Sequence, residues 1–539
     1  MDPDDGSLSV AATASDGTAA RIAALRARLV TPLPDDGLWG WIGPLLVTAF
    51  AGFLRFNRLS VPDAIIFDET YYAKDAWSIL QHGVEWNWNQ FPNANTQIIA
   101  GDSTFHFSCS GTACGEFVVQ PPVGKLLMAV GEWLYGLTTL GWRIAPAIFG
   151  TLAILIMCRV ARRVTRSTLL GCTAGLLLSL DGLEFVLSRT GILDIFLMFF
   201  VLAAFGCLVI DRDASRLRLA EAVTLERYDD DAGPALGIRK WRVAAGVLIG
   251  LAGATKQYGA WYVIAFACLC VAWDIGARRT AGLPGYIRGG LVRDGKWLPV
   301  TLGLIPLVTY IATWAGWFAT STGYDRNYAQ VNGINTPIIS QLYSLYEYHK
   351  AMLQFGVGLS TRHPYESQPW DWFVISRPVA FYWTSYMDAA GAQVAKAGTT
   401  GPYVQEVLAI GNPAIWWVSI PALIFCLGWW LTRRDWRAGA ALLGVAAGWA
   451  TWLPFVSRTK FYYYSLEFEP FVIIAIVLCL GLIIGPATAT PWRRAIGATL
   501  AGTYVLAALV LFWYFYPILA GKIIPYSDWL SHMWYPGWI

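Results

Sequence analysis

The chain has 539 residues, of which 56% are apolar and only 14% are charged, whereas a typical soluble domain carries about a quarter charged residues. Its formal net charge of +3 is too small to favour a nucleic-acid partner. The composition therefore excludes an ordinary soluble globule and indicates a protein that folds largely in lipid.

The first 37 residues are the least apolar part of the chain. They open with MDPDDGSLSVAATASDGT, which is acidic and polar and lacks the pattern of a cleaved signal peptide. We expect residues 1–37 to form a mostly disordered tail on the cytoplasmic side.

Apolar stretches long enough to cross a membrane follow this tail. A spanning helix needs about 20 mostly apolar residues. Eleven stretches are candidates, of which the fifth is short: 38–56, 143–161, 169–187, 190–210, 243–256, 258–275, 298–318, 412–431, 438–455, 465–485 and 495–517. We therefore predict an all-α polytopic membrane protein with about eleven transmembrane helices.

Basic residues set the orientation. With the N-terminus inside, 24 of the 39 Lys and Arg residues lie on the cytoplasmic side. The short loops 159–168, 432–437 and 486–494 are all basic and all lie there, as the positive-inside rule requires. The opposite orientation would place these clusters outside.

This orientation defines two large extracytoplasmic segments, 57–142 and 319–411, both rich in Trp, Tyr, Asn, Gly and Pro. Helices 2–7 fall within 143–318, helices 8–11 fall within 412–517, and the tail 518–539 is outside. The stretch 121–137 is apolar but carries Lys and Glu, so we interpret it as an interfacial helix.

Two of the nine cysteines, Cys109 and Cys114, lie close together in the first outer segment. Disulfides persist outside the cell, which favours a bridge between them over two free thiols. The other seven lie in or near apolar spans, where a thiol behaves as a small hydrophobe.

A pair of adjacent carboxylates, Asp68 and Glu69, follows the first span within PDAIIFDETYYAKDAW. Tyr71 and Tyr72 flank them. A carboxylate against aromatic rings at a membrane surface can have a raised pKa and act as a base. The alternative is an ordinary loop or a helix N-terminus.

Four cations fall at the predicted outer ends of helices, where they could together hold an anionic group such as a lipid phosphate: Lys125, Arg143, Arg189 and Lys256. Arg189 could instead pair with Asp194, and Lys256, beside Gln257, could simply extend to the interface. Another outer turn, SRTKFYYYSLEFEP, contains Arg458 and Tyr464. Its tyrosines fit either an aromatic belt or a sugar pocket.

Five blocks in chain order carry a resemblance: FDETYY, QPPVGKLL, WRIAPAIFGTL, LDGLEFVLSRTGILDIFLMFF and GATKQYGAWY. Over about residues 40 to 520 the sequence resembles the protein O-mannosyltransferases, family-39 glycosyltransferases of the GT-C architecture, and most closely the actinobacterial members. Gln120 stands where His is usual, and 462–464 is Tyr-Tyr-Tyr where eukaryotic members have His-His-Tyr. The segment 319–411 is too short for their β-trefoil MIR domain.

The resemblance implies an enzyme of the plasma membrane that moves mannose, with inversion, from a polyprenyl-phosphate donor to Ser or Thr hydroxyls of secreted proteins. Because a phosphate leaves as an anion without a general acid, one carboxylate base suffices, unlike the carboxylate pair of glycosidases. We assign Asp68 as the base and Glu69 as the group that orients the acceptor, with Glu69 as the alternative base. By resemblance, the residues that hold donor phosphate or sugar are Lys125, Arg143, Arg189, Lys256 and Gln257, with Tyr71, Tyr72, Asp194, Arg458 and Tyr464 as further pocket candidates.

Other functions remain open at this point. A related GT-C enzyme could move another sugar, such as arabinose, onto a lipid or cell-wall glycan. A transporter would show internal repeats and polar residues at the bilayer midplane, whereas here the polar groups gather at one face. No cofactor is required and no metal ligands occur at diagnostic spacing, although a divalent cation such as Mg²⁺ or Mn²⁺ could bind the carboxylates. The secretion translocon is a further candidate partner.

Overall fold

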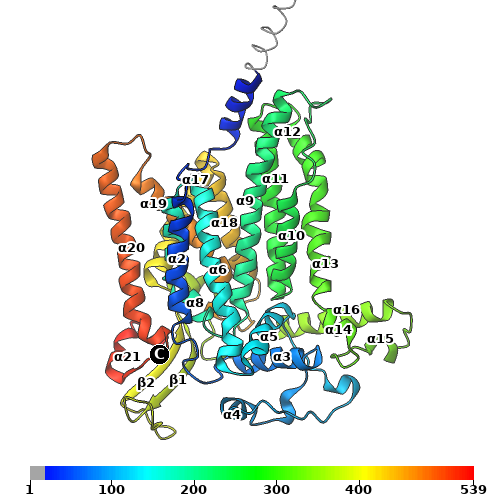
Figure 1. Cartoon of the computed structure of the whole chain (residues 1–539), viewed down its shortest axis with the longest axis vertical. Coiled ribbons are helices and arrows are strands. Elements are labelled where there is room, and N and C mark those ends of the chain that lie inside the picture. The colour runs from blue at the N-terminus through cyan, green and yellow to red at the C-terminus, as the bar shows by residue number, and fades with distance from the viewer. Residues whose placement is uncertain (1–17) are drawn as a thin grey trace, which may run out of the picture.

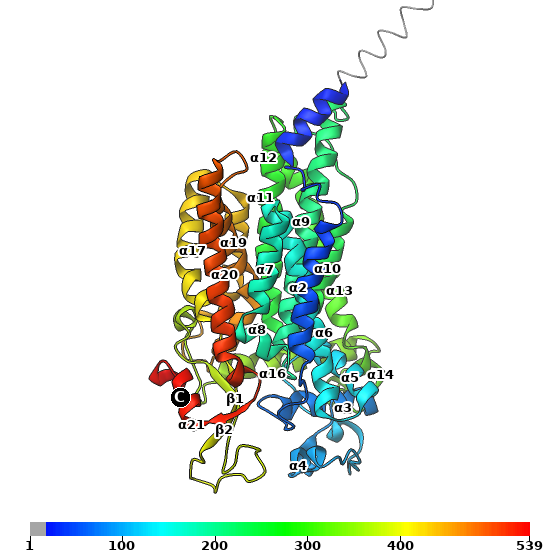
Figure 2. The same ribbon diagram turned by 60° about the vertical axis from the view of Figure 1, so that its left-hand side comes forward.

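A tall bundle of near-parallel helices dominates the computed structural model, which describes residues 18–539 (Figure 1, Figure 2). Within these residues, eight helical stretches are long and apolar enough to cross a membrane: α2 (Trp39–Phe56), α6 (Thr139–Thr165), α9 (Asp194–Thr224), η3 with α11 (Gln257–Thr280), α12 (Tyr286–Arg288) through α13 (Ile305–Ala312), α17 (Pro413–Arg433), η9 with α19 (Tyr462–Ile484) and α20 (Pro491–Leu519). The predicted polytopic, mostly helical architecture is confirmed.

The remaining three predicted spans contain shorter helices. Both α10 (Lys240–Gly253) and α18 (Trp436–Trp449) have 14 residues, or about 21 Å of helix, less than the hydrocarbon thickness of about 30 Å. The stretch 169–187 is divided into α7 (Thr168–Ser179) and α8 (Gly182–Leu187). The break falls at Asp181, whose buried carboxylate accepts from the backbone N–H of Leu183 at 2.8 Å and thereby caps α8.

Short elements gather at one end of the bundle (Figure 1). They are α3 (Glu69–His82), α4 (Ala94–Ile99), α5 (Val123–Tyr135), α14 (Ala315–Ala319), α15 (Tyr328–Val331) and α16 (Ile339–Gly358). Helix α5, within the stretch expected to be interfacial, has 13 residues and packs against α3 and α6. This end of the molecule is called the loop end below.

The chain also forms a small antiparallel sheet, whereas the sequence predicted only helices. Its order is β1 (Val379–Tyr386), β2 (Tyr403–Ala409) and β3 (Ile523–Pro525), followed by α21 (Tyr526–His532). The sheet joins the second outer segment to the C-terminal tail. Its strands are rich in aromatic and β-branched residues, which favour pleated structure.

The end of the N-terminal segment is ordered, contrary to the expected disordered tail. Residues 18–29 are helical, and residues 1–17 lie outside the described part of the chain. Leu29 and Val30 are buried against Leu219 of α9 and Ala277 of α11. The apolar side chains that follow the polar stretch therefore dock this segment on the bundle.

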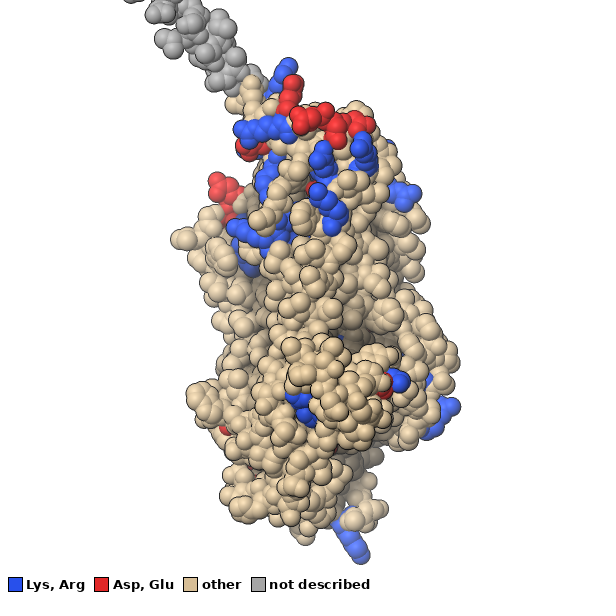
Figure 3. All heavy atoms as spheres, turned by 90° about the vertical axis from the view of Figure 1, so that its right-hand side faces the viewer, with Lys and Arg blue, Asp and Glu red and all other residues tan. Residues whose placement is uncertain are grey.

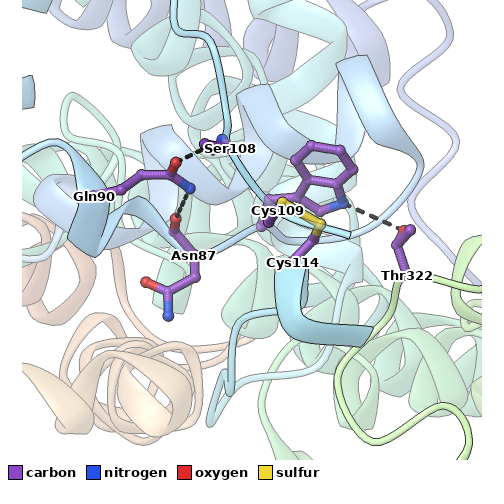
Figure 4. Close-up of a disulfide and its surroundings, with 7 residues drawn as sticks. Asn87, Gln90, Ser108, Cys109, Cys114 and Thr322 are labelled. Atoms are coloured by element: carbon purple, nitrogen blue, oxygen red, sulfur yellow. Dashed lines mark hydrogen bonds between the residues drawn. A yellow bond between two sulfur atoms is a disulfide. The ribbon is translucent and has the colours of Figure 1, made fainter. Parts of the chain in front are cut away.

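A disulfide joins Cys109 to Cys114 in the segment between α2 and α6, with a Cα–Cα distance of 5.2 Å (Figure 4). Beside it, Gln90 accepts from the backbone N–H of Ser108 at 2.8 Å. The bridge closes the loop that leads directly into residues 116–120, one wall of the cavity described below.

Charged side chains lie mainly toward the two ends of the bundle. Figure 3 shows them crowded at the end opposite the loop end, with a broad uncharged band below. Several arginines at that crowded end are buried in ion pairs, as in Arg239 with Asp211 at 2.6 Å and Arg242 with Asp274 at 2.6 Å. This distribution suits a bilayer around the band.

Candidate active site

A cavity of about 530 Å³ lies at the loop end, where the helices meet the outer segments. It is lined by Lys256 and by four stretches: residues 67–75 around the start of α3, 116–125 before and within α5, 355–363 at and after the end of α16, and 458–464 before α19. The cavity brings together most of the predicted pocket residues, namely Asp68, Tyr71, Tyr72, Lys125, Lys256, Arg458 and Tyr464.

Asp68 is the N-cap residue of α3, and its carbonyl accepts from the N–H groups of Tyr71 and Tyr72 at 3.0 and 3.1 Å. The preceding Phe67 has a positive φ of 47°, and its ring is fixed in a stack on Phe381 of β1 at 4.5 Å. This strained turn directs the half-buried Asp68 carboxylate into the cavity.

The surroundings of Asp68 make it a weaker acid than usual. Burial raises the pKa of Asp68 to about 6, although Lys256 opposes the rise, Asp194 adds to it, and hydrogen bonding from Tyr463 lowers it. A carboxylate with this pKa is ionised at neutral pH yet can accept a proton readily. This pKa supports the prediction that Asp68 is the base.

Glu69 is turned away from the cavity and is completely buried. Its carboxylate accepts from Arg143 at 2.7 and 2.9 Å, from the N–H of Gly191 at 2.8 Å and from the N–H of Ile66 at 3.0 Å. These four bonds occupy both oxygens. These bonds anchor the turn that carries Asp68, and this geometry does not support the predicted role of Glu69 in orienting the acceptor.

Arg143 and Arg189 also form hydrogen bonds outside the cavity, mostly with backbone carbonyls. Besides Glu69, Arg143 donates to the carbonyls of Pro62 and Ala64, each at 2.8 Å. Arg189 donates to four carbonyls at the end of α2, those of Leu54, Arg55, Asn57 and Arg58, at 2.7 to 2.9 Å. Neither arginine lines the cavity, and both brace the connection between α2 and α3, so this geometry does not support the prediction that they hold the donor.

Lys125 lines the cavity, but its charge is balanced. Its ammonium lies 2.5 Å from Glu85 and 3.6 Å from Asp75, and the side chain is fully buried. Glu85 and Asp75 had not been singled out, because they lie 40 and 50 residues earlier in the chain with no spacing that marks them as its partners. Lys125 is better placed to support α3 and α5 than to hold an anion.

Lys256 acts on Asp68 through its positive charge, which lowers the pKa of that carboxyl. Its ammonium contacts Asp194 at 2.7 Å and lies 5.4 Å from the ring centre of Tyr464. Asp194 also accepts from the hydroxyl of Tyr258 at 2.9 Å. The suggested pairing of Asp194 with Arg189 is therefore wrong, and Asp194 instead holds Lys256 at the cavity wall.

Arg458 lines the cavity without a carboxylate partner among the described residues. It is half-buried, and it donates to the backbone carbonyls of Gly356 and Thr459. It also lines a second, mostly apolar groove of about 360 Å³, which Gln257 and Trp261 line as well. The predicted residue Gln257 thus faces the groove, and Arg458 stands where groove and cavity meet.

His363, Gln120 and Phe461 also line the cavity. Burial lowers the pKa of His363, which keeps its ring neutral near pH 7. No spacing in the sequence marked His363, since it lies in a loop brought to the cavity by the packing of α16. Within the part of the chain that the structure describes, no three His, Cys, Asp or Glu side chains are grouped to hold a metal ion.

Comparison with known proteins places this geometry in a family. Residues 45–313 match the family described as dolichyl-phosphate-mannose-protein mannosyltransferase, and residues 341–538 match the C-terminal four-transmembrane region of protein O-mannosyltransferases. The chain belongs to the protein O-mannosyltransferase family. The resemblance drawn from the five sequence blocks is thereby confirmed.

Relatives in this family match along nearly the whole chain. Polyprenol-phosphate-mannose–protein mannosyltransferases of Mycolicibacterium smegmatis strain MKD8 and Mycobacterium tuberculosis strain H37Rv are each 38% identical, cover 94% of this chain, and are themselves covered over 96% and 93% of their length. The Saccharomyces cerevisiae protein O-mannosyltransferase Pmt1–Pmt2 complex bound to the sugar donor superposes with a TM-score of 0.68 at 14% identity, covering 96% of this chain and 94% of that one. The chain therefore shares its overall fold with the yeast complex.

Proposed function

We propose that this protein transfers mannose from polyprenyl-phosphate mannose to Ser or Thr hydroxyls of secreted polypeptides. The observation that carries the proposal is the junction at Arg458 of an apolar groove and an aromatic cavity that also holds charged side chains, with the Asp68 carboxylate in the cavity wall. The names of the relatives supply the donor and the protein acceptor.

The two cavities suit the two parts of such a donor. The apolar groove beside Gln257 and Trp261 takes the first units of the polyprenyl tail. Arg458 and Lys256, which both face the cavity, take the phosphate, since guanidinium and ammonium groups bind phosphate through charge-assisted hydrogen bonds. The mannose then lies in the aromatic cavity near Asp68.

The reaction needs one proton acceptor. The acceptor hydroxyl attacks C1 of mannose, the bond from C1 to the phosphate oxygen breaks with its electron pair, and Asp68 takes the hydroxyl proton. The departing phosphate monoester carries the negative charge, which Lys256 and Arg458 stabilise. Attack opposite to the leaving phosphate inverts the configuration at C1.

The rate of transfer is expected to depend on pH through Asp68. Since burial raises the pKa of Asp68 to about 6, the carboxylate is protonated and inactive as a base below that pH. We expect kcat/KM to rise with pH along a limb centred near pH 6 and to level off above it. A limb centred near pH 4 instead would show that a solvent-exposed carboxylate is the base.

Replacing Lys256 is expected to weaken the binding of the lipid-linked donor and to slow transfer from it. Lys256→Met removes a cation beside the donor phosphate, so we expect a higher KM for the lipid-linked donor, a lower turnover, and an unchanged KM for the acceptor peptide. Lys256→Arg keeps the charge and should recover part of the loss. Normal donor kinetics in Lys256→Met would remove this residue from the phosphate site.

We infer that the loop end faces outward from the plasma membrane, with the N-terminus cytoplasmic and the C-terminus outside. Single cysteines at Ser103 and Ala389, in a chain without the Cys109–Cys114 bridge, are expected to react with a membrane-impermeant thiol reagent on intact cells. One at Asp230 should not react. Labelling at position 230 alone would show that the orientation is the reverse of the one inferred. It would also rule out a secreted acceptor and the translocon as partners.

The donor is tested with membranes that contain the protein, a Thr- and Pro-rich peptide, and labelled mannose carried either on polyprenyl phosphate or on a nucleoside diphosphate. We expect label in the peptide from the lipid-linked donor alone. Transfer from the nucleotide sugar in membranes stripped of polyprenyl phosphate would contradict the proposed donor.

A further inference from the structure

A second polar cavity, of about 320 Å³, lies at the end of the bundle opposite the loop end. Its volume falls in the range of about 300–1,000 Å³ typical of small-molecule sites. We call it the arginine cavity, because five arginines line it: Arg28 of the N-terminal segment, Arg166 after α6, Arg212 and Arg216 of α9, and Arg437 of α18.

Two carboxylates partly neutralise these five cations. Asp435 pairs with Arg437 at 2.7 Å. Asp213 is shared between Arg166 at 2.8 Å and Arg212 at 3.0 Å, and Arg163 reaches it as well. The arginine cavity therefore retains an excess of positive charge.

Arg28 and Arg216 have only carbonyls as hydrogen-bond partners within residues 18–539, and Asp213 and Asp274 act on Arg216 only through their charge. Arg28 donates to Thr280 at 3.1 Å, and Arg216 donates to Leu29 at 3.1 Å and to Trp273 at 3.4 Å. A carbonyl satisfies a donor but does not cancel its charge, so the repulsion among the clustered guanidinium groups persists.

Buried donors at the arginine cavity also lack partners. The Nε atoms of Arg212 and Arg216 are shielded from solvent and make no hydrogen bond, and the Arg212 side chain is only 5% exposed. Arg212 is held rigidly by its stack on the Trp436 ring at 3.8 Å. Fixed, partly unpartnered guanidinium groups around one space match the chemistry of a phosphate, which they bind in a bidentate manner.

We propose that the arginine cavity binds a phosphate-bearing anion, either the headgroup of an acidic phospholipid or a soluble polyphosphate, and that this anion fastens residues 28–31 to the bundle. Basic pockets between transmembrane helices on the cytoplasmic side are a recognised setting for acidic headgroups. Trp436 adds the aromatic ring that is common at a membrane interface. The site is separate from the Asp68 cavity, with which it shares no lining residue.

Binding is measured on the purified full chain in lipid-free detergent, by native mass spectrometry and by thermal unfolding. The probes are cardiolipin, phosphatidylcholine as the neutral lipid, and inorganic triphosphate as the soluble anion. We expect cardiolipin or triphosphate to raise the unfolding temperature and phosphatidylcholine to leave it unchanged. A response to triphosphate but not to cardiolipin assigns the site to a soluble anion, and the converse assigns it to a lipid.

Matched variants locate the binding. Arg212→Gln/Arg216→Gln is expected to weaken binding by about tenfold or more, as the loss of charge-assisted hydrogen bonds predicts. Arg28→Gln, at an exposed position that cannot unfold the bundle, should also weaken it. Arg227→Gln, exposed beyond the end of α9, is the control and should bind normally. Equal binding in all variants, or no response to either anion, would overturn the proposal.

Discussion

Asp68→Asn is expected to lower the turnover of mannosyl transfer by about 10²–10⁴-fold, the usual contribution of a general base. Asparagine keeps the shape of the side chain and its hydrogen bonding but cannot take the proton of the acceptor hydroxyl. Donor binding should survive, because Lys256 and Arg458 remain in the cavity wall. Single-turnover transfer from a labelled lipid donor, with donor binding measured separately, resolves the two effects.

Asp102→Asn is the matched control for this experiment. Asp102 is a carboxylate of the same outer segment, where it accepts from Thr104 at 2.9 Å and does not line the cavity. It should retain normal turnover. Near-normal turnover in Asp68→Asn would show that this carboxylate is not the base and would turn attention to the other proton acceptors that line the cavity, Asp75, Glu116 and His363.

Arg143→Ala is expected to reduce folded protein rather than donor affinity. Arg143 and Glu69 are both buried, and removing one member of a buried ion pair typically costs about 3–5 kcal/mol because the other charge is left uncompensated. Three backbone carbonyls of the turn after α2 would also lose their donor. The yield and thermal unfolding of the purified protein measure the loss.

The double variant Arg143→Met/Glu69→Gln removes both charges and should be more stable than Arg143→Ala alone, since no unpaired charge remains. Its turnover should stay below that of the wild type because the turn that carries Asp68 loses its anchor. If Arg143→Ala folded normally and only raised the KM for the donor, Arg143 would return to the phosphate site where the sequence had suggested it.

Several features of the site could be predicted from the sequence. Carboxylates directly after a span, and cations at the outer ends of spans, are visible because charge is rare in this chain. This reasoning identified Asp68, Lys256 and Arg458, and the structure brings all three to one cavity. Hydropathy likewise marked the helices, because lipid requires long apolar stretches.

The roles of Glu69, Arg143 and Arg189 could not be predicted. Their partners are each other or main-chain carbonyls of the irregular turn between α2 and α3, and backbone acceptors leave no mark in a sequence. The sheet was not predicted for a related reason. Strand β2 pairs with β3 more than a hundred residues later, and such long-range pairing leaves no local pattern in the sequence. The break at Asp181 coincides with an Asp-Gly pair in the sequence, but the apolar residues on both sides of it led to the prediction of a single span.

The central claim is that the acceptor is a polypeptide hydroxyl. The most direct measurement uses the purified chain in liposomes with labelled polyprenyl-phosphate mannose and two peptides that differ only by replacement of every Ser and Thr with Ala. The account predicts alkali-labile mannose on the first peptide and none on the second, with transfer lost in Asp68→Asn. Labelled mannose on a glycan or lipid acceptor, with neither peptide labelled, would contradict it.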